Sequence, residues 1–401
     1  MGGYLARELL NQGNEVFGLI RRRSDSSKPK LLNELGIYDE IKFIHSDISE
    51  LSNLLSAISY SNPDWMFHLA AQSFVPRSFS DPLGTFQANC LGTQNVLEAL
   101  RLKDMNTRFV FAGSSEEYGL QFMDETHFNQ MEIKYGKESL DPKPESYPEI
   151  PINEKNYLRP MSPYATSKVF GDFATRNYHK TFGMNTVVSR AFNHEGAGRG
   201  HDFVTSSIAR QLTAIHLKEQ DYMRIGDVTA FRDWSHIEDI VNGYILLADK
   251  ANPGSLYVQG SGRTHSVLSY ILYAISSLGY EVKAVTNFKG DKKTNDPLGE
   301  SRIKIGGYSV KSNNIDKMIL DKDLKFGLED EGIEILTDKL KFIIKFDSKL
   351  FRPSDVPLLL SDISKISELG YKPHKEITDI INDQINYYLD PYHRDNILEG
   401  K

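Results

Sequence analysis

A tyrosine and a lysine stand four positions apart in the segment Tyr164-Ala165-Thr166-Ser167-Lys168. The surrounding residues, 162–182, have the pattern of a helix, and this spacing places both side chains on one helical face. A neighbouring ammonium group favours phenolate over phenol, which lowers the pKa of a tyrosine from its usual value of about 10. Such a tyrosine can take the proton of a hydroxyl group while hydride leaves the same carbon atom. The alternative is an ordinary pair of side chains on a helix surface.

A second group of candidate residues follows an apolar run at 108–112, which predicts a buried strand. The run continues into Gly113-Ser114-Ser115-Glu116-Glu117. In a parallel sheet, ligands bind at the carboxyl ends of the strands. A serine hydroxyl there can hydrogen-bond a substrate oxygen, and a carboxylate can act as a general base. A turn with solvated glutamates is the alternative, and the order Ser, Tyr, Lys along the chain favours a site.

Segments after other predicted strands have the features of a dinucleotide site. Arg21 and Arg22 follow the predicted strand 15–20. Arginines at this place accommodate the 2′-phosphate of NADP, whereas an acidic residue would hold the 2′-hydroxyl of NAD. NADP is therefore the favoured cofactor over NAD, with a solvated basic turn as the alternative. The further candidate cofactor contacts are Gly2, Asp47, Ile48, Leu69, Ala70, Ala71, Gln72 and Ser73.

The amino end differs from that of a dinucleotide-binding fold. Such folds open with a strand and a glycine-rich turn, because glycines let a pyrophosphate approach the backbone at a helix N-terminus. Met1-Gly2-Gly3 stands where that turn would end, and the first strand and the first two glycines have no counterpart in the sequence. The dinucleotide-binding domain therefore lacks its first strand in this sequence. Either the strand and its glycines lie upstream of Met1, or the chain is a degraded or rebuilt relative.

A polar, glycine-rich segment at 192–200 follows another apolar run. It contains His194 and Glu195, but two adjacent ligands without a third at a usable spacing predict no metal site. Arg232, in Arg232-Asp233-Trp234-Ser235-His236, and Arg352 are candidate contacts for a nucleotide or diphosphate. A surface position is the alternative for each arginine.

Helix-like and strand-like segments alternate along the first half of the chain. This alternation predicts βαβ units and a parallel sheet. The expected fold class is α/β: a doubly wound, Rossmann-like parallel sheet with a smaller mixed α/β substrate domain. We expect the dinucleotide-binding domain at 1–185, with part of 230–260 returning to it, and the substrate domain at 186–230 and 261–401. The expected strands are 15–20, 41–45, 65–70, 108–112 and 185–192, and the expected helices are 4–12, 51–59, 85–102, 162–182, 203–218, 268–278, 362–369 and 377–389.

Two polar segments interrupt this pattern. Residues 120–160 are rich in Pro, Glu, Lys and Tyr and predict an extended surface loop. A long loop next to a candidate site is either an idle insertion or a lid. Residues 289–332 are charged, with few aromatic side chains, and predict a second insertion.

The composition excludes several classes of protein. The chain has 401 residues, of which 40% are apolar and 25% charged, so it is neither disordered nor a fibre or coiled-coil rod. A net charge of −7 argues against a nucleic-acid partner. The single cysteine, Cys90, permits neither an internal disulfide nor a cysteine-based zinc cluster. Neither a membrane span nor a signal peptide is predicted, and we expect a cytoplasmic protein.

Together these motifs resemble the extended short-chain dehydrogenase/reductase family of nucleotide-sugar enzymes, the NAD-dependent epimerases/dehydratases. The resemblance covers most of the chain apart from the two insertions and the amino end. Within the family, the motifs are most similar to the GDP-mannose 4,6-dehydratase branch. The shared motifs are the arginine pair 21–22, S-S-E-x-Y-G at 114–119, F-N-H-E at 192–195, R-D-W-x-H at 232–236 and F-R-P-x-D-V at 351–356.

The resemblance implies a role for each candidate residue. Tyr164 would be the base at O4 of the sugar, and Lys168 would hold it and the nicotinamide ribose. Glu116 would remove the C5 proton and Ser114 would hydrogen-bond the C4 oxygen. His194 and Arg199 match cofactor contacts, and the implied substrate contacts are Ser115, Asn193, Arg232 and Arg352. The implied reaction converts GDP-mannose to GDP-4-keto-6-deoxymannose, and hydride returns to the same sugar.

Some features leave alternatives open. Ser114 stands where the family more often has threonine, and Glu117 stands at a usually apolar position. Which of Glu116 and Glu117 faces the substrate is therefore undecided. A nucleotide-sugar epimerase, decarboxylase or 4-keto reductase is the alternative function, and a non-catalytic relative is a third. The resemblance also implies a homodimer or homotetramer, with the helices 85–102 and 162–182 as a candidate interface.

Overall fold

Four parallel strands form the main sheet of the first half of the chain. In the computed structural model, which describes residues 1–21, 28–104, 106–305, 307–351 and 356–393, their order is β10 (Leu256–Gln259), β5 (Thr186–Ala191), β4 (Arg108–Ala112) and β3 (Trp65–His68). All of β5 and the centre of β4 are buried. Such continuous burial is typical of a parallel strand that is covered on both faces.

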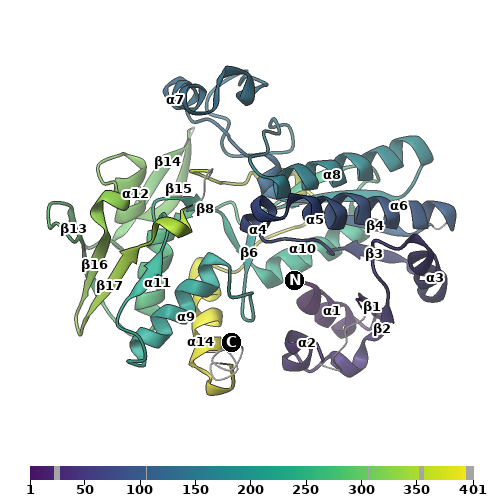
Figure 1. The fold of residues 1–401 in the computed structure, drawn as a ribbon, viewed down its shortest axis with the longest axis horizontal. Helices are drawn as coiled ribbons and strands as arrows, with labels where there is room; N and C mark the ends of the chain where they lie inside the picture. Colours follow the sequence, from purple (N-terminus) through teal and green to yellow (C-terminus); the bar gives the residue numbers. More distant parts are fainter. Residues whose placement is uncertain (22–27, 105, 306, 352–355, 394–401) are drawn as a thin grey trace.

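Helices cover this sheet on both faces, and alternate residues of each strand contact opposite layers (Figure 1). Val110 and Val187 pack against α1 (Gly2–Asn11) and α10 (Ile237–Lys250). Phe109 and Phe111 pack with α3 (Leu51–Ser61), α6 (Gly92–Leu102) and the end of α8 (Pro163–Phe182). The predicted doubly wound α/β fold is therefore confirmed.

The parallel strands are divided into two groups. Strands β1 (Phe17–Ile20) and β2 (Lys42–His45) pair only with each other among the described residues. They lie below β3 in Figure 1, next to α1. In a dinucleotide-binding sheet with the order 3-2-1-4-5-6, the first strand separates the second from the fourth. The division between β1 and β3 falls at that place.

The second half of the chain builds a mixed five-stranded sheet, at the left of Figure 1. Its order is β13 (Lys293–Asn295), β12 (Val282–Asn287), β16 (Gly332–Thr337), β17 (Lys341–Phe346) and β7 (Met223–Ile225). Isoleucines of β16 and β17 pack in one core with helices α9 (Val204–His216), α11 (Val267–Ser277) and α14 (Ile377–Leu389). This is the smaller mixed α/β unit that the sequence predicts. The domain boundaries themselves stay a prediction.

Short elements connect the two units. Besides β1 and β2, three further strand pairs lie outside the larger sheets in the described residues: β6 (Asn193–Glu195) with β9 (Trp234–His236), β8 (Phe231–Arg232) with β11 (His265–Ser266), and β14 (Glu300–Ile305) with β15 (Tyr308–Asn313). The remaining helical elements are α2 (Lys30–Glu34), η1 (Tyr38–Glu40), α4 (Val75–Ser80), α5 (Pro82–Phe86), η2 (Gln87–Leu91), η3 (Ser115–Glu117), α7 (Glu125–Tyr135), η4 (Lys137–Leu140), α12 (Asn314–Leu320), η5 (Leu328–Asp330), η6 (Ser348–Leu350) and α13 (Ser364–Ser367).

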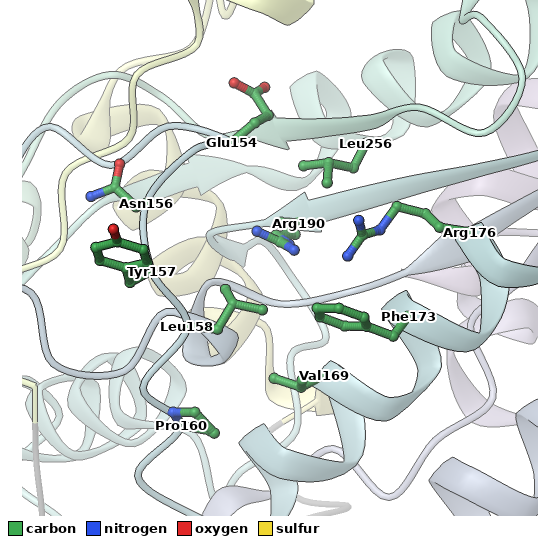
Figure 2. Close-up of a pocket in the computed structure, with 10 residues that line it drawn as sticks. All are labelled: Glu154, Asn156, Tyr157, Leu158, Pro160, Val169, Phe173, Arg176, Arg190 and Leu256. Atoms are coloured by element: carbon green, nitrogen blue, oxygen red, sulfur yellow. The ribbon is translucent and has the colours of Figure 1, made fainter. Parts of the chain in front are cut away.

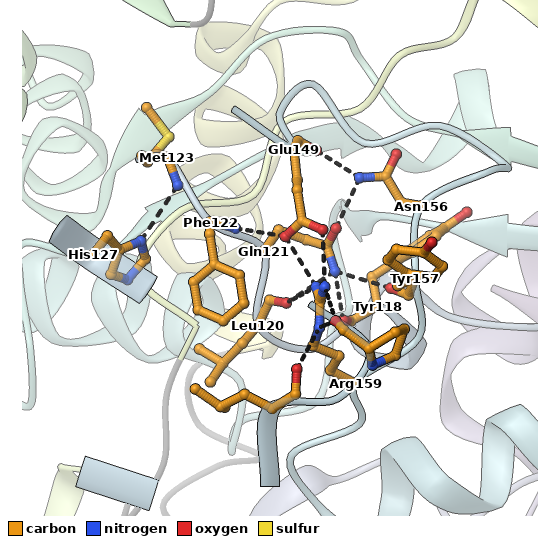
Figure 3. Close-up of polar contacts among 12 residues, drawn as sticks. Tyr118, Leu120, Gln121, Phe122, Met123, His127, Glu149, Asn156, Tyr157 and Arg159 are labelled. Atoms are coloured by element: carbon orange, nitrogen blue, oxygen red, sulfur yellow. Dashed lines mark hydrogen bonds and ion pairs between the residues drawn. The ribbon is translucent and has the colours of Figure 1, made fainter. Parts of the chain in front are cut away.

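The segment 120–160 is not the extended surface loop that the sequence predicts. It contains α7 and a small apolar core formed by Leu120, Phe122, Phe128 and Leu140. The buried Arg159 guanidinium bonds both carboxylate oxygens of Glu149 at 2.9 Å. It also donates to the carbonyl oxygens of Leu120, Leu140 and Pro142, as Figure 3 illustrates for the surrounding contacts. A buried ion pair and a local core therefore order this segment.

The second insertion is also structured and meets the first. Ile303 and Ile305 of β14 share a buried cluster with Ile150 and Ile152 of the 120–160 segment. Residue 152 also forms backbone hydrogen bonds with residues 360 and 362, near the carboxyl end. The two polar segments are therefore packed against one another.

The helix expected at 85–102 is present, but its hydrogen-bonding pattern changes along its length. It consists of α5, the π-helical turn η2 and α6. Such turns place an extra residue into a helix and often occur at functional sites. Across the described ranges, none of the helices combines the length and the apolar character that a membrane crossing requires.

Candidate active site

Tyr164 lies in the first turn of α8, opposite the end of β4. Ser162 caps this helix, because its hydroxyl accepts the Ala165 N–H at 3.0 Å, and Pro163 occupies the first helical position. The Tyr164 phenol is hydrogen-bonded to the Ser114 side chain, which caps the 3-10 turn η3 after β4. The two predicted residues therefore meet at the carboxyl edge of the parallel sheet.

Lys168 lies one turn further along α8 and is also buried. Its ammonium nitrogen donates to the carbonyl oxygen of Ala112, the last residue of β4, at 2.7 Å. The same nitrogen is 5.9 Å from the centre of the Tyr164 ring. Burial lowers the pKa of Lys168 to about 8, and the nearby Glu117 opposes this shift. The predicted pair is therefore formed, with the lysine anchored on the end of β4.

The Tyr164 phenol does not have the lowered pKa that the sequence predicts. Burial raises its pKa above the usual value, and the carboxyls of Glu116 and Glu117 raise it further. The hydrogen bond with Ser114 and the charge of Arg199 act in the opposite direction but are weaker. Desolvation of the charged phenolate is the reason, because a buried phenol loses more hydration on ionisation than these groups return.

The two adjacent glutamates point in different directions. Glu117 is fully buried, and its carboxyl accepts the Ser114 N–H at 2.8 Å. Glu116 is only half-buried and acts on the phenol of Tyr164. The structure therefore turns Glu117 into the protein interior and leaves Glu116 as the glutamate at the accessible edge of the sheet.

The candidate contacts to the adenosine end lie after β1 and β2. The charge of Arg21 helps to lower the pKa of Asp47, although hydrogen bonds from Ser49 are the main cause. The side chain of Ile48 lies against Gly92, where a Cβ atom would be 2.6 Å from Ile48 Cδ1. Arg22 lies outside the described residues. Arg21, Asp47 and Ile48 are thus brought together at one edge of the β1–β2 pair.

Hydrogen bonds connect the loop after β3 to the π-helical turn η2, which is bonded in turn to α8. Asn89 of the π-helical turn accepts the Gln72 N–H at 2.7 Å and donates to both the Gln72 carbonyl and the Ser167 hydroxyl. Leu69 lies next to Gly2, 3.9 Å from the position of a Cβ atom there. Ala70 and Ser73 are exposed, whereas Ala71 is half-buried. This loop therefore runs from the start of α1 to the helix that carries Tyr164.

His194, Arg199 and Glu195 form a further cluster near Tyr164. Burial lowers the pKa of His194 to about 3, so its imidazole is neutral at neutral pH, and its Nδ1 atom lies 2.9 Å from the Phe192 carbonyl oxygen. The Arg199 guanidinium lies 3.3 Å from the Glu195 carboxylate and 3.5 Å from the centre of the Phe203 ring. Asn193 precedes His194 in β6 and is half-buried. The cluster also surrounds the amino group of Met1, since Arg199 and Glu195 both act on it.

The predicted substrate residues are distributed over two places. Ser115 is buried in η3, beside Ser114. Arg232 lies in β8, and its guanidinium donates to the carbonyl oxygens of Phe231 at 2.8 Å and Val356 at 2.7 Å. Arg352 lies outside the described residues. The structure thus places Arg232 in a group of contacts around β8 and residues 356–361.

Three important residues are not among the sequence-predicted candidates. Asn89 connects the Gln72 loop to α8, and Asp172 and Arg190 form a buried ion pair at 2.8 Å behind the site. Two signals in the sequence point to that pair: an aspartate one turn after Lys168, and a single charged residue, Arg190, in the predicted strand 185–192. Within the described part of the chain, we find no group of three His, Cys, Asp or Glu side chains arranged to hold a metal ion.

Known proteins are similar in sequence to this chain over most of its length. Residues 1–260 match the model of the NAD dependent epimerase/dehydratase family. A GDP-mannose 4,6-dehydratase of Sinorhizobium fredii (strain HH103) is 31% identical over 394 residues, which cover 96% of this chain and 92% of the relative. A GDP-mannose 4,6 dehydratase of Drosophila melanogaster is 27% identical, with 96% and 82% covered.

Solved structures have the same fold at lower identity. DesIV, a dTDP-glucose 4,6-dehydratase from Streptomyces venezuelae solved with NAD and TYD bound, has a TM-score of 0.66 at 20% identity and covers 97% of this chain and 94% of its own. RMD from Pseudomonas aeruginosa, solved with NADPH, has a TM-score of 0.62 at 20% identity, with 94% and 99% covered. The family match over more than half of the sequence and the 31% identical relative agree with the site geometry, and the chain belongs to the NAD dependent epimerase/dehydratase family.

Proposed function

We propose that this chain is a nucleotide-sugar 4,6-dehydratase that converts GDP-mannose to GDP-4-keto-6-deoxymannose with NADP as its cofactor. One observation carries the proposal: Ser114, Glu116 and Tyr164 converge at the carboxyl edge of β4. A carboxylate beside the phenol supplies the second base that a dehydration needs and that a simple hydride transfer does not. Relatives with this activity in their names, at 27–31% identity, support the same conclusion.

The residues present fit a dinucleotide along most of its length. Arg21 lies beside Asp47 at the end that would hold the adenosine, and an arginine there favours the 2′-phosphate of NADP over the hydroxyl of NAD. Lys168 and Tyr164 stand at the other end, where a nicotinamide ribose would bind. Between them, Gly2 opens α1, and a Cβ atom there would have only Leu69 within 4 Å, so the backbone is approachable. When bound, the nicotinamide accepts a hydride and later returns it.

Tyr164 acts at the C4 hydroxyl of the sugar. The Ser114 hydroxyl, hydrogen-bonded to the phenol, is placed to hold the same C4 oxygen. Burial raises the pKa of the phenol, but the Ser114 hydrogen bond and the charge of Arg199 act against this shift, and the Lys168 ammonium lies 5.9 Å from the ring. Tyr164 therefore removes the O4 proton as C4 becomes a carbonyl carbon.

Glu116 acts at the neighbouring carbon. A proton at C5 becomes acidic once C4 is a ketone, because the negative charge left behind spreads onto the carbonyl oxygen. Glu116 removes this proton as a general base and returns it to the C6 hydroxyl, which leaves as water while a C5–C6 double bond forms. Its half-buried position at the edge of the sheet permits this role, whereas the buried Glu117 faces away.

A homodimer or homotetramer is part of the proposal. Apolar side chains that are 40–59% exposed lie on neighbouring helices: Leu91 in η2, Leu102 in α6, and Phe170, Phe173 and Phe182 in α8. A second copy that covers them would remove this apolar surface from water. Light scattering after size-exclusion chromatography tests this: we expect a dimer or larger assembly that Phe173→Asp dissociates and that Tyr60→Asp, at an exposed side chain on α3, does not.

The decisive experiment is incubation of the purified protein with GDP-mannose and NADP. Mass spectrometry should detect a product that has lost one water, with no net change in absorbance by NADPH. Consumption of NADPH in proportion to product would instead indicate a reductase. Recovery of unchanged GDP-mannose would contradict the proposal, and recovery of an isomer of equal mass would indicate an epimerase.

A further inference from the structure

Glu117 is a buried carboxyl directly behind the turn that carries Ser114 and Glu116. Its side chain has no exposed surface, and one oxygen accepts the backbone N–H of Ser114 at 2.8 Å. The same oxygen would be only 2.6 Å from a Cβ atom at Gly113, so the turn and the carboxyl are in close contact. Ser114 in turn accepts the Glu116 N–H at 3.2 Å, which completes a capping box.

The other side of Glu117 faces an ion pair that is complete without it. Arg190 Nε lies 2.8 Å from one Asp172 oxygen, and Arg176 Nε lies 2.5 Å from the other. Figure 2 shows Arg176 and Arg190 side by side in the wall of a pocket of about 450 Å³, on the side of α8 that carries Val169 and Phe173. Glu117 approaches the same Arg190 Nε only at 3.3 Å. Asp172 therefore satisfies the arginine, and Glu117 adds a second buried carboxyl beside it.

A second buried carboxyl is costly unless its bonds offset the lost hydration. Burial, followed by the charge of Asp172, raises the pKa of Glu117 to about 8, while Arg190 and the Ser114 N–H oppose the shift. The contact that distinguishes Glu117 from Asp172 is its bond to the Ser114 backbone. An apolar side chain of similar size would fill the space without making that bond.

We infer that Glu117 is a positioning residue, which holds the 114–117 turn so that Ser114 reaches Tyr164 and Glu116 faces the substrate. This inference rests on the proposed dehydratase function. Neighbouring residues in a 3-10 turn are about 120° apart. Fixing Glu117 inward therefore directs Glu116 outward, which settles the choice between the two glutamates.

The charge of Glu117 also acts on the reacting groups. The titratable and charged groups that face it are Lys168 and Asp172 of α8, Arg190 of β5, Tyr118 of its own turn, and Tyr164 and Tyr244. An ionised Glu117 raises the pKa of both Tyr164 and Lys168. Ionisation of Glu117 therefore disfavours the phenolate that takes the O4 proton and favours the charged form of Lys168.

Two variants separate these effects. Glu117→Gln keeps an oxygen that can accept the Ser114 N–H but cannot ionise, and Glu117→Leu keeps only the volume. For GDP-mannose dehydration, we expect Glu117→Leu to lose roughly tenfold or more in kcat, as the loss of a buried hydrogen bond predicts. We expect Glu117→Gln to retain most of the activity at neutral pH and to change the pH dependence of kcat/KM around pH 8, where the wild-type carboxyl ionises.

Glu149→Gln is the matched control, because Glu149 is also a buried glutamate paired with an arginine but lies in the 120–160 segment. It should leave the pH profile of kcat/KM in place even if it lowers stability. Wild-type kcat and an unchanged pH profile in Glu117→Leu would overturn the inference, as would equal effects in both Glu117 variants.

A measurement without substrate keeps the two proposals separate. Amide hydrogen exchange at residues 113–117 should be faster in Glu117→Leu than in the wild type, and close to the wild type in Glu117→Gln. If the wild type does not dehydrate GDP-mannose, the proposed function fails while this exchange result still reports on the turn. Unchanged exchange in Glu117→Leu would refute the positioning role whatever the activity.

Discussion

Removing Glu149 should release the folded segment at 120–160. Arg159 is 3% exposed, and its guanidinium bonds both Glu149 oxygens at 2.9 Å. One of these oxygens also accepts the Phe122 N–H at 3.0 Å. Glu149→Ala therefore leaves a buried cation without its counter-charge and a buried N–H without its acceptor, and Figure 3 shows how many contacts meet at this point.

The expected free-energy cost of Glu149→Ala follows from the burial of its ion pair with Arg159. Removing one partner of a buried ion pair costs about 3–5 kcal/mol, because the remaining charge is left uncompensated in a medium of low polarity. The apolar core of the segment is small, with four buried residues, so this loss is large relative to the packing energy that keeps the segment folded. A cost of about 3–5 kcal/mol corresponds to roughly two to three and a half orders of magnitude in the opening equilibrium.

Native-state hydrogen exchange of residues 120–160 measures this equilibrium directly. We expect faster exchange in Glu149→Ala within this segment and little change in β4 and β5. Glu145→Ala is the control, because the hydrogen bond that Glu145 accepts from Tyr157 is exposed. The double variant Glu149→Leu, Arg159→Met should recover much of the protection, since an apolar pair needs no counter-charge. Opening free energies within about 1 kcal/mol of the wild type in Glu149→Ala would refute this reasoning.

Three further predictions concern the site. Tyr164→Phe should lower kcat by roughly 10²- to 10⁴-fold while NADP binding, followed by fluorescence, is preserved, and a smaller loss would exclude Tyr164 as the base. Arg21→Ala should weaken NADP binding by about tenfold and leave NAD binding unchanged in calorimetry, and equal losses for both would contradict a contact to the 2′-phosphate. Because the pKa of Glu117 is about 8 in the folded protein against a usual 4.5, the folded state keeps a proton that the unfolded chain releases, and stability falls as pH rises through this window. In thermal unfolding, the stability of Glu117→Gln should fall less steeply with pH than that of the wild type, by about 1.4 kcal/mol per pH unit. Parallel stability curves for the two proteins would show that Glu117 is ionised throughout.

The sequence predicts the parallel sheet well because its elements carry strong local patterns. The strand at 108–112 has the predicted bounds, and the helix at 162–182 begins one residue later than expected, after its serine cap. The pattern at 85–102 predicts a regular helix and does not reveal the π-helical turn. Such a turn depends on what Asn89 contacts in space, which no periodicity reveals.

The prediction for the segment 120–160 is wrong for a related reason. Its four core residues, Leu120, Phe122, Phe128 and Leu140, are irregularly spaced, so the segment shows neither a helical nor a strand period. Arg159 and Glu149 look like ordinary surface charges until the fold brings them together. The sequence leaves the orientation of Glu116 and Glu117 undecided for the same reason. The two residues are of the same type and adjacent in the chain, so only their surroundings in the fold distinguish them.

The division of the parallel strands has a consequence for how the protein opens. Strands β1 and β2 share no backbone hydrogen bonds with β3 among the described residues, so side-chain packing, through Leu5, Val16 and Leu35, joins them to the larger sheet. Packing contacts of this kind separate more readily than a hydrogen-bonded ladder. Within the described residues, separating the edge that carries Arg21 and Asp47 from β3 would therefore disrupt side-chain contacts and no strand ladder.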